Sequence, residues 1–170
     1  MDIFPSMVTA VAFYDVILFV HITAVVLLLG PTYAYPVFLA VAERTDPRAL
    51  PAVGRGIAAW DRIGLLMLVV VLAAGLYLVG DSEAWSFGDF YVTWGFAYVL
   101  LIGGMSAMYF SPKTVQLIEL AERDIAASGS GEVKLSAEFH SLSARVGQVG
   151  TILGVLGILT IYFMTAKPFL

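Results

Sequence analysis

The chain has 170 residues, of which 60 % are hydrophobic and 13 % are charged, and its mean hydropathy is +0.91. Soluble domains average about 45–50 % apolar and about 25 % charged residues, so this composition excludes an ordinary soluble protein. The absence of cysteine excludes disulfides, thiolate metal sites and iron–sulfur clusters. The net charge of −4 decides little, because in a membrane protein the placement of positive charges matters more than the sum.

Four stretches reach the length of about 20 apolar residues that a bilayer core requires. They cover residues 8–30, 57–79, 90–110 and 146–166. The first stretch has Asp2 in place of a basic n-region and no small-residue cleavage site, so we expect a retained helix and not a signal peptide. The sequence thus predicts an all-α integral membrane protein, a single domain over residues 1–170 that forms an up-down bundle of four transmembrane helices.

The helices are expected to extend beyond the membrane. Pro31 and Pro36 follow the first span and predict a kink, with helix continuing beyond it from Tyr33 to Glu43. Residues 111–145 predict a cytoplasmic helical hairpin with a flexible tip at Ser128-Gly129-Ser130-Gly131. The fourth helix is expected to begin early, because apolar residues recur at spacings of 4, 3, 4 and 3 at Leu135, Phe139, Leu142, Val146 and Val149.

The placement of the basic residues predicts the topology. Eight of the nine Lys and Arg residues lie in or beside the first and third loops, residues 31–56 and 111–145, and only Lys167 lies elsewhere. Because cytoplasmic loops carry the excess of Lys and Arg, both loops are predicted in the cytoplasm. The N- and C-termini are then on the outer side of the cell inner (plasma) membrane. The lipid bilayer is the expected partner, and no nucleic-acid, phosphate-loop or hydrolase motif occurs.

His21 is the one ionisable residue placed deep in an apolar span, and such a residue is a functional candidate by default. It could ligate a haem iron, make a structural hydrogen bond to a neighbouring helix, or relay protons. His140 is a poor candidate for a second axial ligand, because it lies six residues before the fourth span and therefore at a different depth from His21. Met67 and Met105 are more simply explained by packing. No catalytic residue is indicated.

The fourth span carries four glycines on one helix face, at spacings of 3, 4 and 3: Gly147, Gly150, Gly154 and Gly157. A face without side chains allows another backbone to approach closely. Close helix packing within the bundle is the first interpretation. A homo-oligomer formed through this seam is the next.

Two short motifs resemble the HemJ-type protoporphyrinogen oxidases, one in the first helix and one at the C-terminal end. They are Val20-His21-Ile22 with Gly30, Tyr35 and Pro36, and Lys167-Pro168-Phe169. The four-helix layout is similar over nearly the whole chain and is shared with copper-resistance D-like membrane domains. The closest resemblance is to a sister family of small predicted integral membrane proteins of unknown function.

The resemblance implies that His21 is the axial ligand of the iron of a b-type haem, in a protein with a redox or haem-related role. Arg62 is then the nearest candidate for a propionate contact. Val37 stands where the family has an arginine, and residues 90–110 lack the family's lysine. If the protein is an enzyme, the resemblance implies an oxidoreductase with an unknown redox partner. The two differences argue against porphyrinogen oxidation as its reaction. The alternatives are a cofactor-free accessory or scaffold subunit of a membrane complex or homo-oligomer and, with less support, a transporter or channel.

Overall fold

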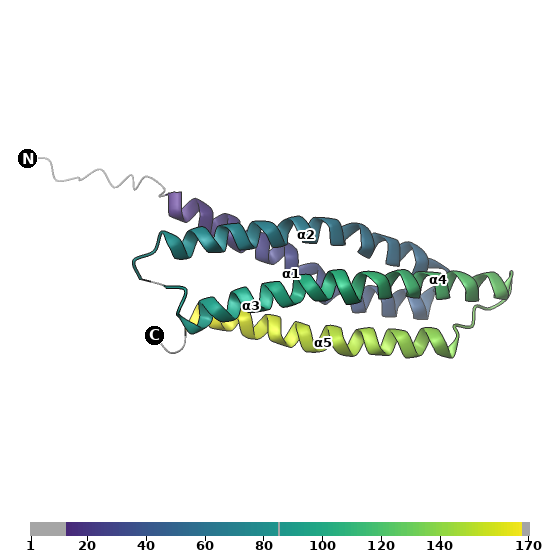
Figure 1. Cartoon of the computed structure of the whole chain (residues 1–170). Coiled ribbons are helices and arrows are strands. Elements are labelled where there is room, and N and C mark those ends of the chain that lie inside the picture. The colour runs from purple at the N-terminus through teal and green to yellow at the C-terminus, as the bar shows by residue number, and fades with distance from the viewer. Residues whose placement is uncertain (1–12, 85, 168–170) are drawn as a thin grey trace, which may run out of the picture.

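The structure, a computed structural model, describes residues 13–84 and 86–167, and its regular secondary structure over these residues is all helical (Figure 1). Its elements are α1 (Phe13–Thr45), η1 (Pro47–Ala49), α2 (Leu50–Gly80), α3 (Phe90–Met105), η2 (Ser106–Phe110), α4 (Ser111–Ser128) and α5 (Ala137–Ala166). Four helical stretches are long and apolar enough to cross a membrane: Phe13–Thr45, Pro47–Gly80, Phe90–Ser128 and Ala137–Ala166. The predicted all-α fold with four spans is confirmed. The helix start expected near Val8 lies outside the described residues.

The first helix continues through both of its prolines. α1 has 33 residues with Pro31 and Pro36 inside it, which makes it about 50 Å long. Next to the first proline, Thr32 Oγ1 donates a hydrogen bond to the Leu29 carbonyl oxygen at 2.6 Å. The helix predicted from Tyr33 to Glu43 is therefore a direct continuation of the first span.

The third span also continues without a break. The π-helical segment η2 joins α3 to α4, and α4 then carries the chain into a charged region that contains Pro112. Such single π-helical turns accommodate extra residues within a longer helix. α5 begins at Ala137, where the Ser136 side chain accepts a hydrogen bond from the Phe139 amide at 3.3 Å. This cap explains why the fourth helix starts far before its apolar part.

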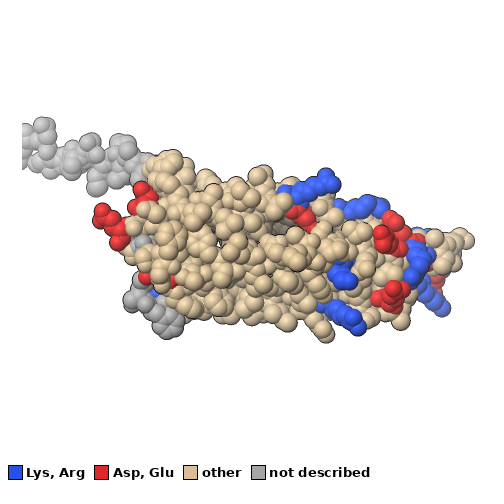
Figure 2. Space-filling model, viewed as in Figure 1, with Lys and Arg blue, Asp and Glu red and all other residues tan. Residues whose placement is uncertain are grey.

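The helices pack as two antiparallel pairs, α1 with α2 and α3 with α5, while α4 lies against α2 and α5 (Figure 1). We call the end that holds residues 46–49 and 129–136 the basic end. The end that holds residues 81–89 is called the acidic end. Figure 2 shows Lys and Arg side chains gathered toward the basic end, with a surface of uncharged residues between the two ends.

The surface between the ends is unsuited to water. Phe19 is 68 % exposed, Leu65 is 63 % exposed and Met108 is 83 % exposed. Within the most apolar part of each span, only 11 to 22 % of the residues are buried inside the chain. Exposed apolar surface on this scale is typical of helices that could cross a membrane.

The basic end has its own hydrophobic core. Ala42, Leu50, Ala121 and Phe139 are buried there against one another, and they come from α1, α2, α4 and α5. Their elements extend past the apolar surface at this end. A buried core outside the exposed apolar surface thus holds the four helical stretches together at this end.

Candidate functional site

His21 is held against α2 by a backbone hydrogen bond. The ring is half-buried, and its Nδ1 lies 3.2 Å from the carbonyl oxygen of Val71. A carbonyl oxygen can only accept, so Nδ1 carries the proton in this bond. In the neutral imidazole, Nε2 then keeps its lone pair and is the atom available as a ligand.

Gly75 allows the ring to lie close to the α2 backbone. A Cβ atom at this position would lie 3.4 Å from His21 Cε1 and 3.9 Å from Phe96 Cζ of α3. A larger side chain would therefore compete with the imidazole for the same space. The glycine places His21 at a junction of three helices, α1, α2 and α3.

The single ligand atom that His21 offers, Nε2, suits a group that brings its own equatorial ligands. Among the described residues, no cluster of three or more His, Cys, Asp or Glu side chains could hold a bare metal ion. A haem supplies four nitrogens and needs only an axial ligand from the protein. An imidazole whose Nδ1 donates to a carbonyl is the usual form of a metal-ligating histidine. The His21 side chain therefore fits an axial ligand of haem, on one side of the iron.

An apolar groove of about 300 Å³ runs between α1 and α2 beside this position. Val20 and Ala74, which precede His21 and Gly75 in the sequence, line it. Phe13 and Tyr77 lie in an edge-to-face contact with ring centroids 5.4 Å apart, and both also line the groove. An apolar groove thus lies between α1 and α2 next to the turn of α1 that carries His21.

The structure does not bring Arg62 to His21. Arg62 is exposed and lies 13 residues before Gly75 on α2, which is about 20 Å along the helix axis. At about 100° per residue, positions 62 and 75 also face directions about 140° apart around the helix. The propionate contact stays a prediction that this geometry does not support.

The second histidine lies at the other end of the molecule. His140 Nδ1 lies 3.3 Å from Glu43 Oε1 at the basic end. Since 22 residues separate Glu43 from His21 on α1, the two histidines are about 33 Å apart along the helix. His140 therefore cannot share a haem with His21, in agreement with the sequence analysis.

Two tyrosines occupy the glycine seam of α5. Tyr33 Oη donates to the Gly154 carbonyl oxygen at 2.9 Å, and Tyr98 Oη donates to the Leu153 carbonyl oxygen at 3.1 Å. A Cβ atom on Gly157 would lie 2.6 Å from Tyr98 Oη and 2.9 Å from Tyr33 Oη. Part of the seam is thus used for packing within the chain, as the first interpretation expected.

The remaining glycines of the seam are less covered. A Cβ atom on Gly150 would lie 3.9 Å from Phe110 Cε1, whereas nothing lies within 4 Å of a Cβ atom on Gly147. The homo-oligomer through this seam stays a prediction.

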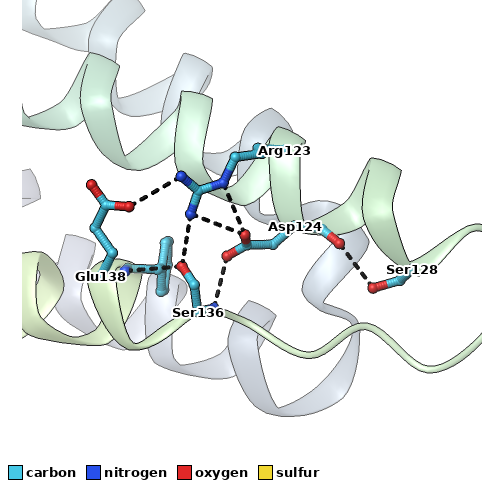
Figure 3. A network of polar contacts seen from close by, with 6 residues as sticks. Arg123, Asp124, Ser128, Ser136 and Glu138 are labelled. Atoms are coloured by element: carbon cyan, nitrogen blue, oxygen red, sulfur yellow. Dashed lines mark hydrogen bonds and ion pairs between the residues drawn. The ribbon is translucent and has the colours of Figure 1, made fainter.

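A polar network fastens α4 to the start of α5 at the basic end (Figure 3). Arg123 pairs with Glu138 at 3.0 Å and with Asp124 at 3.2 Å, and it also donates to Ser136 Oγ at 3.1 Å. Asp124, only 8 % exposed, accepts a hydrogen bond from the Ser136 amide at 2.7 Å. Desolvation of Asp124 opposes its ionisation, but the bonds from Ser136 and Arg123 outweigh it and lower the pKa of this carboxyl.

The two connections at the basic end are also joined. Arg48 Nη2 donates to the carbonyl oxygens of Gly129 and Gly131 at 2.7 and 3.0 Å. Arg55 and Glu122 form an ion pair at 2.6 Å, although both side chains are more than half exposed. The Arg48 bonds thus join the two connections, and the Arg55–Glu122 ion pair joins α2 to α4.

Sequence reasoning missed the partners of the candidate residues. Val71 acts through its carbonyl oxygen, which every residue has, so no side-chain pattern could indicate it. Gly75 did offer a signal, because a glycine inside a helix costs about 1 kcal/mol relative to alanine and often marks a close approach. Tyr33 and Tyr98 carry no motif that links them to α5.

No protein-family model, curated protein or solved structure matches this chain.

Proposed function

We propose that the protein is an integral membrane protein that binds b-type haem, with His21 as the axial ligand, and that it has a redox or haem-related role. The observation that carries this proposal is the hydrogen bond between His21 Nδ1 and the Val71 carbonyl oxygen. It fixes the ring and directs the unprotonated Nε2 away from that bond. The apolar groove lined by Val20 and Ala74, the residues that precede His21 and Gly75, supports the same conclusion.

Haem supplies reversible one-electron chemistry at its iron, at a potential that the axial ligand and surrounding polarity adjust. The chain's own contribution is to orient the imidazole and to keep water from it. The Val71 carbonyl holds the ring plane, Gly75 gives it room, and Phe96 covers the same junction from α3.

We propose that the basic end faces the cytoplasm and that the membrane is the cell inner (plasma) membrane. Eight of the nine Lys and Arg residues support this orientation. A cysteine introduced at Ser82 of the acidic end is then expected to react with a membrane-impermeant thiol reagent in whole cells. One introduced at Ser128 of the basic end is expected to stay unlabelled until the cells are opened.

A second candidate is a cofactor-free accessory or scaffold subunit. It is favoured by the core and ion pairs at the basic end, which give that end a fixed shape. In this case the Val71 hydrogen bond would be the whole role of His21. A transporter or channel has less support.

An absorbance spectrum of the detergent-purified, full-length protein, made with ample haem, separates these proposals. We expect a Soret band, and an α-band after reduction by dithionite. His21→Ala is expected to lose both bands, with partial recovery on addition of imidazole, whereas the matched variant His140→Ala keeps them. Absence of both bands in the unmodified protein would refute haem binding, and bands that persist in His21→Ala would refute the ligand assignment.

A further inference from the structure

A groove of about 510 Å³ lies between α4 and α5 on the outer surface of the basic end. Its apolar lining residues are Leu120 from α4 and Leu142 from α5. The Arg123–Glu138 ion pair, at 3.0 Å, lies at the end of the groove that is farthest from the apolar surface. The other end opens where α5 enters its apolar part.

The charges along the groove have a fixed order. Arg145 stands directly before Val146, where the apolar part of α5 begins. Because α4 and α5 are antiparallel and Arg123 pairs with Glu138, Arg145 lies at the level of Gln116. Glu119 is one helical turn, about 5 Å, farther from the apolar surface. Going outward, a positive side chain is thus followed by a negative one.

Both of these side chains are available to a ligand. Neither Arg145 nor Glu119 has an ion pair or hydrogen bond among the residues that the structure describes, and both are exposed. Ser141, which also lines the groove, offers a hydroxyl at about the level of Glu119. The groove is therefore a place where an anion and a cation, joined in one molecule, would each find an opposite charge.

We propose that this groove binds the headgroup of a membrane phospholipid that carries a primary ammonium, of the phosphatidylethanolamine class. In such a lipid the phosphate lies next to the acyl chains and the ammonium lies farther out, which matches Arg145 and then Glu119. The headgroup layer of one leaflet is about 5–8 Å thick, comparable to the separation of the two charges along the helices. The acyl chains remain in the bilayer beside α5.

The chemistry of the groove favours ethanolamine over other common headgroups. A primary ammonium donates hydrogen bonds to a carboxylate, whereas the quaternary ammonium of choline cannot. Choline is usually recognised by aromatic rings, and none lines the groove. A glycerol headgroup carries no positive charge. It would therefore place its phosphate near the Glu119 carboxylate with no cation between the two negative charges.

The proposal is tested by native mass spectrometry of the full-length protein in detergent. Phosphatidylethanolamine, phosphatidylcholine and phosphatidylglycerol with identical acyl chains are added in equal amounts. We expect ethanolamine lipid to be retained about two- to fivefold more than choline lipid, the range for exposed charge pairs. Glu119→Gln is expected to remove this preference, and Arg145→Gln to lower the retention of all three lipids.

Lys134→Gln is the matched control, since Lys134 is an exposed cation of the basic end outside the groove. It is expected to leave lipid retention unchanged. All three replaced side chains are exposed, so circular dichroism should report the same helix content in each variant. Equal retention of ethanolamine and choline lipids, stronger retention of the glycerol lipid, or an unchanged preference in Glu119→Gln would overturn the proposal.

Discussion

Replacing Gly157 by alanine is expected to destabilise the bundle, although alanine favours helix. The added Cβ atom would lie 2.6 Å from Tyr98 Oη and 2.9 Å from Tyr33 Oη. Both hydroxyls sit at the ends of rigid rings and donate to carbonyl oxygens of α5. The rings can move away only if these hydrogen bonds are lost or α5 shifts.

The magnitude follows from the two costs. Overpacking of a tight contact costs about 1–3 kcal/mol. Interhelical hydrogen bonds in membrane proteins contribute about 0.6 kcal/mol each, so losing two adds about 1 kcal/mol. Gly147→Ala on the same helix meets nothing within 4 Å and gains the same helix propensity. We therefore expect Gly157→Ala to be less stable than Gly147→Ala by about 2–4 kcal/mol.

The measurement is equilibrium unfolding in mixed SDS micelles, followed by circular dichroism for both variants under the same conditions. Gly157→Ala combined with Tyr98→Phe removes the nearer hydroxyl and should recover part of the loss. If Gly157→Ala proves as stable as Gly147→Ala, the tyrosine packing described for this seam is wrong.

Two further predictions concern polar groups. Tyr35 Oη is buried without a hydrogen-bond partner among the described residues. Tyr35→Phe should therefore leave the free energy of unfolding unchanged or raise it slightly. A clear loss of stability in the same SDS assay would contradict this prediction. At the basic end, the lowered pKa of Asp124 means that its ionised form stabilises the fold above its ordinary pKa of about 4. This stabilisation is lost as the pH falls through the lower pKa of the folded state. Asp124→Asn should therefore melt below the unmodified protein near pH 7, and the difference should shrink in acid; a difference independent of pH would contradict the reasoning.

The four spans could be predicted because hydrocarbon imposes one strong rule on sequence, an apolar run of sufficient length. Helix ends outside the membrane were harder to place, since the apolar run no longer marks them. α1 ends at Thr45, close to the helix end predicted at Glu43, but α2 begins at Leu50, well before the predicted run 57–79. There the helices are held by a buried core and by caps such as Ser136, whose effect depends on tertiary packing.

The candidate site was predictable only in its central residue. His21 stands out because an ionisable group in an apolar run is costly, and this cost can be read from one sequence. Its surroundings depend on which turns of α1 and α2 face each other. That register is set by contacts such as Leu28 beside Gly64, and by the core around Ala42 and Leu50 at the far end. The sequence of one helix alone does not indicate this register.

The position of His21 within the bundle bears on how a cofactor would act on stability. The pairs α1–α2 and α3–α5 are joined near their middle by Tyr33 and at the basic end by the buried core. His21 lies on the acidic side of both connections, where Phe96 approaches it from α3. A ligand held there would link the two pairs, and any ligand that binds only the folded state stabilises it in proportion to its affinity. Haem added to the unloaded protein should thus raise its unfolding temperature, and His21→Ala should remove that gain, whereas a purely structural His21 would give no gain to remove.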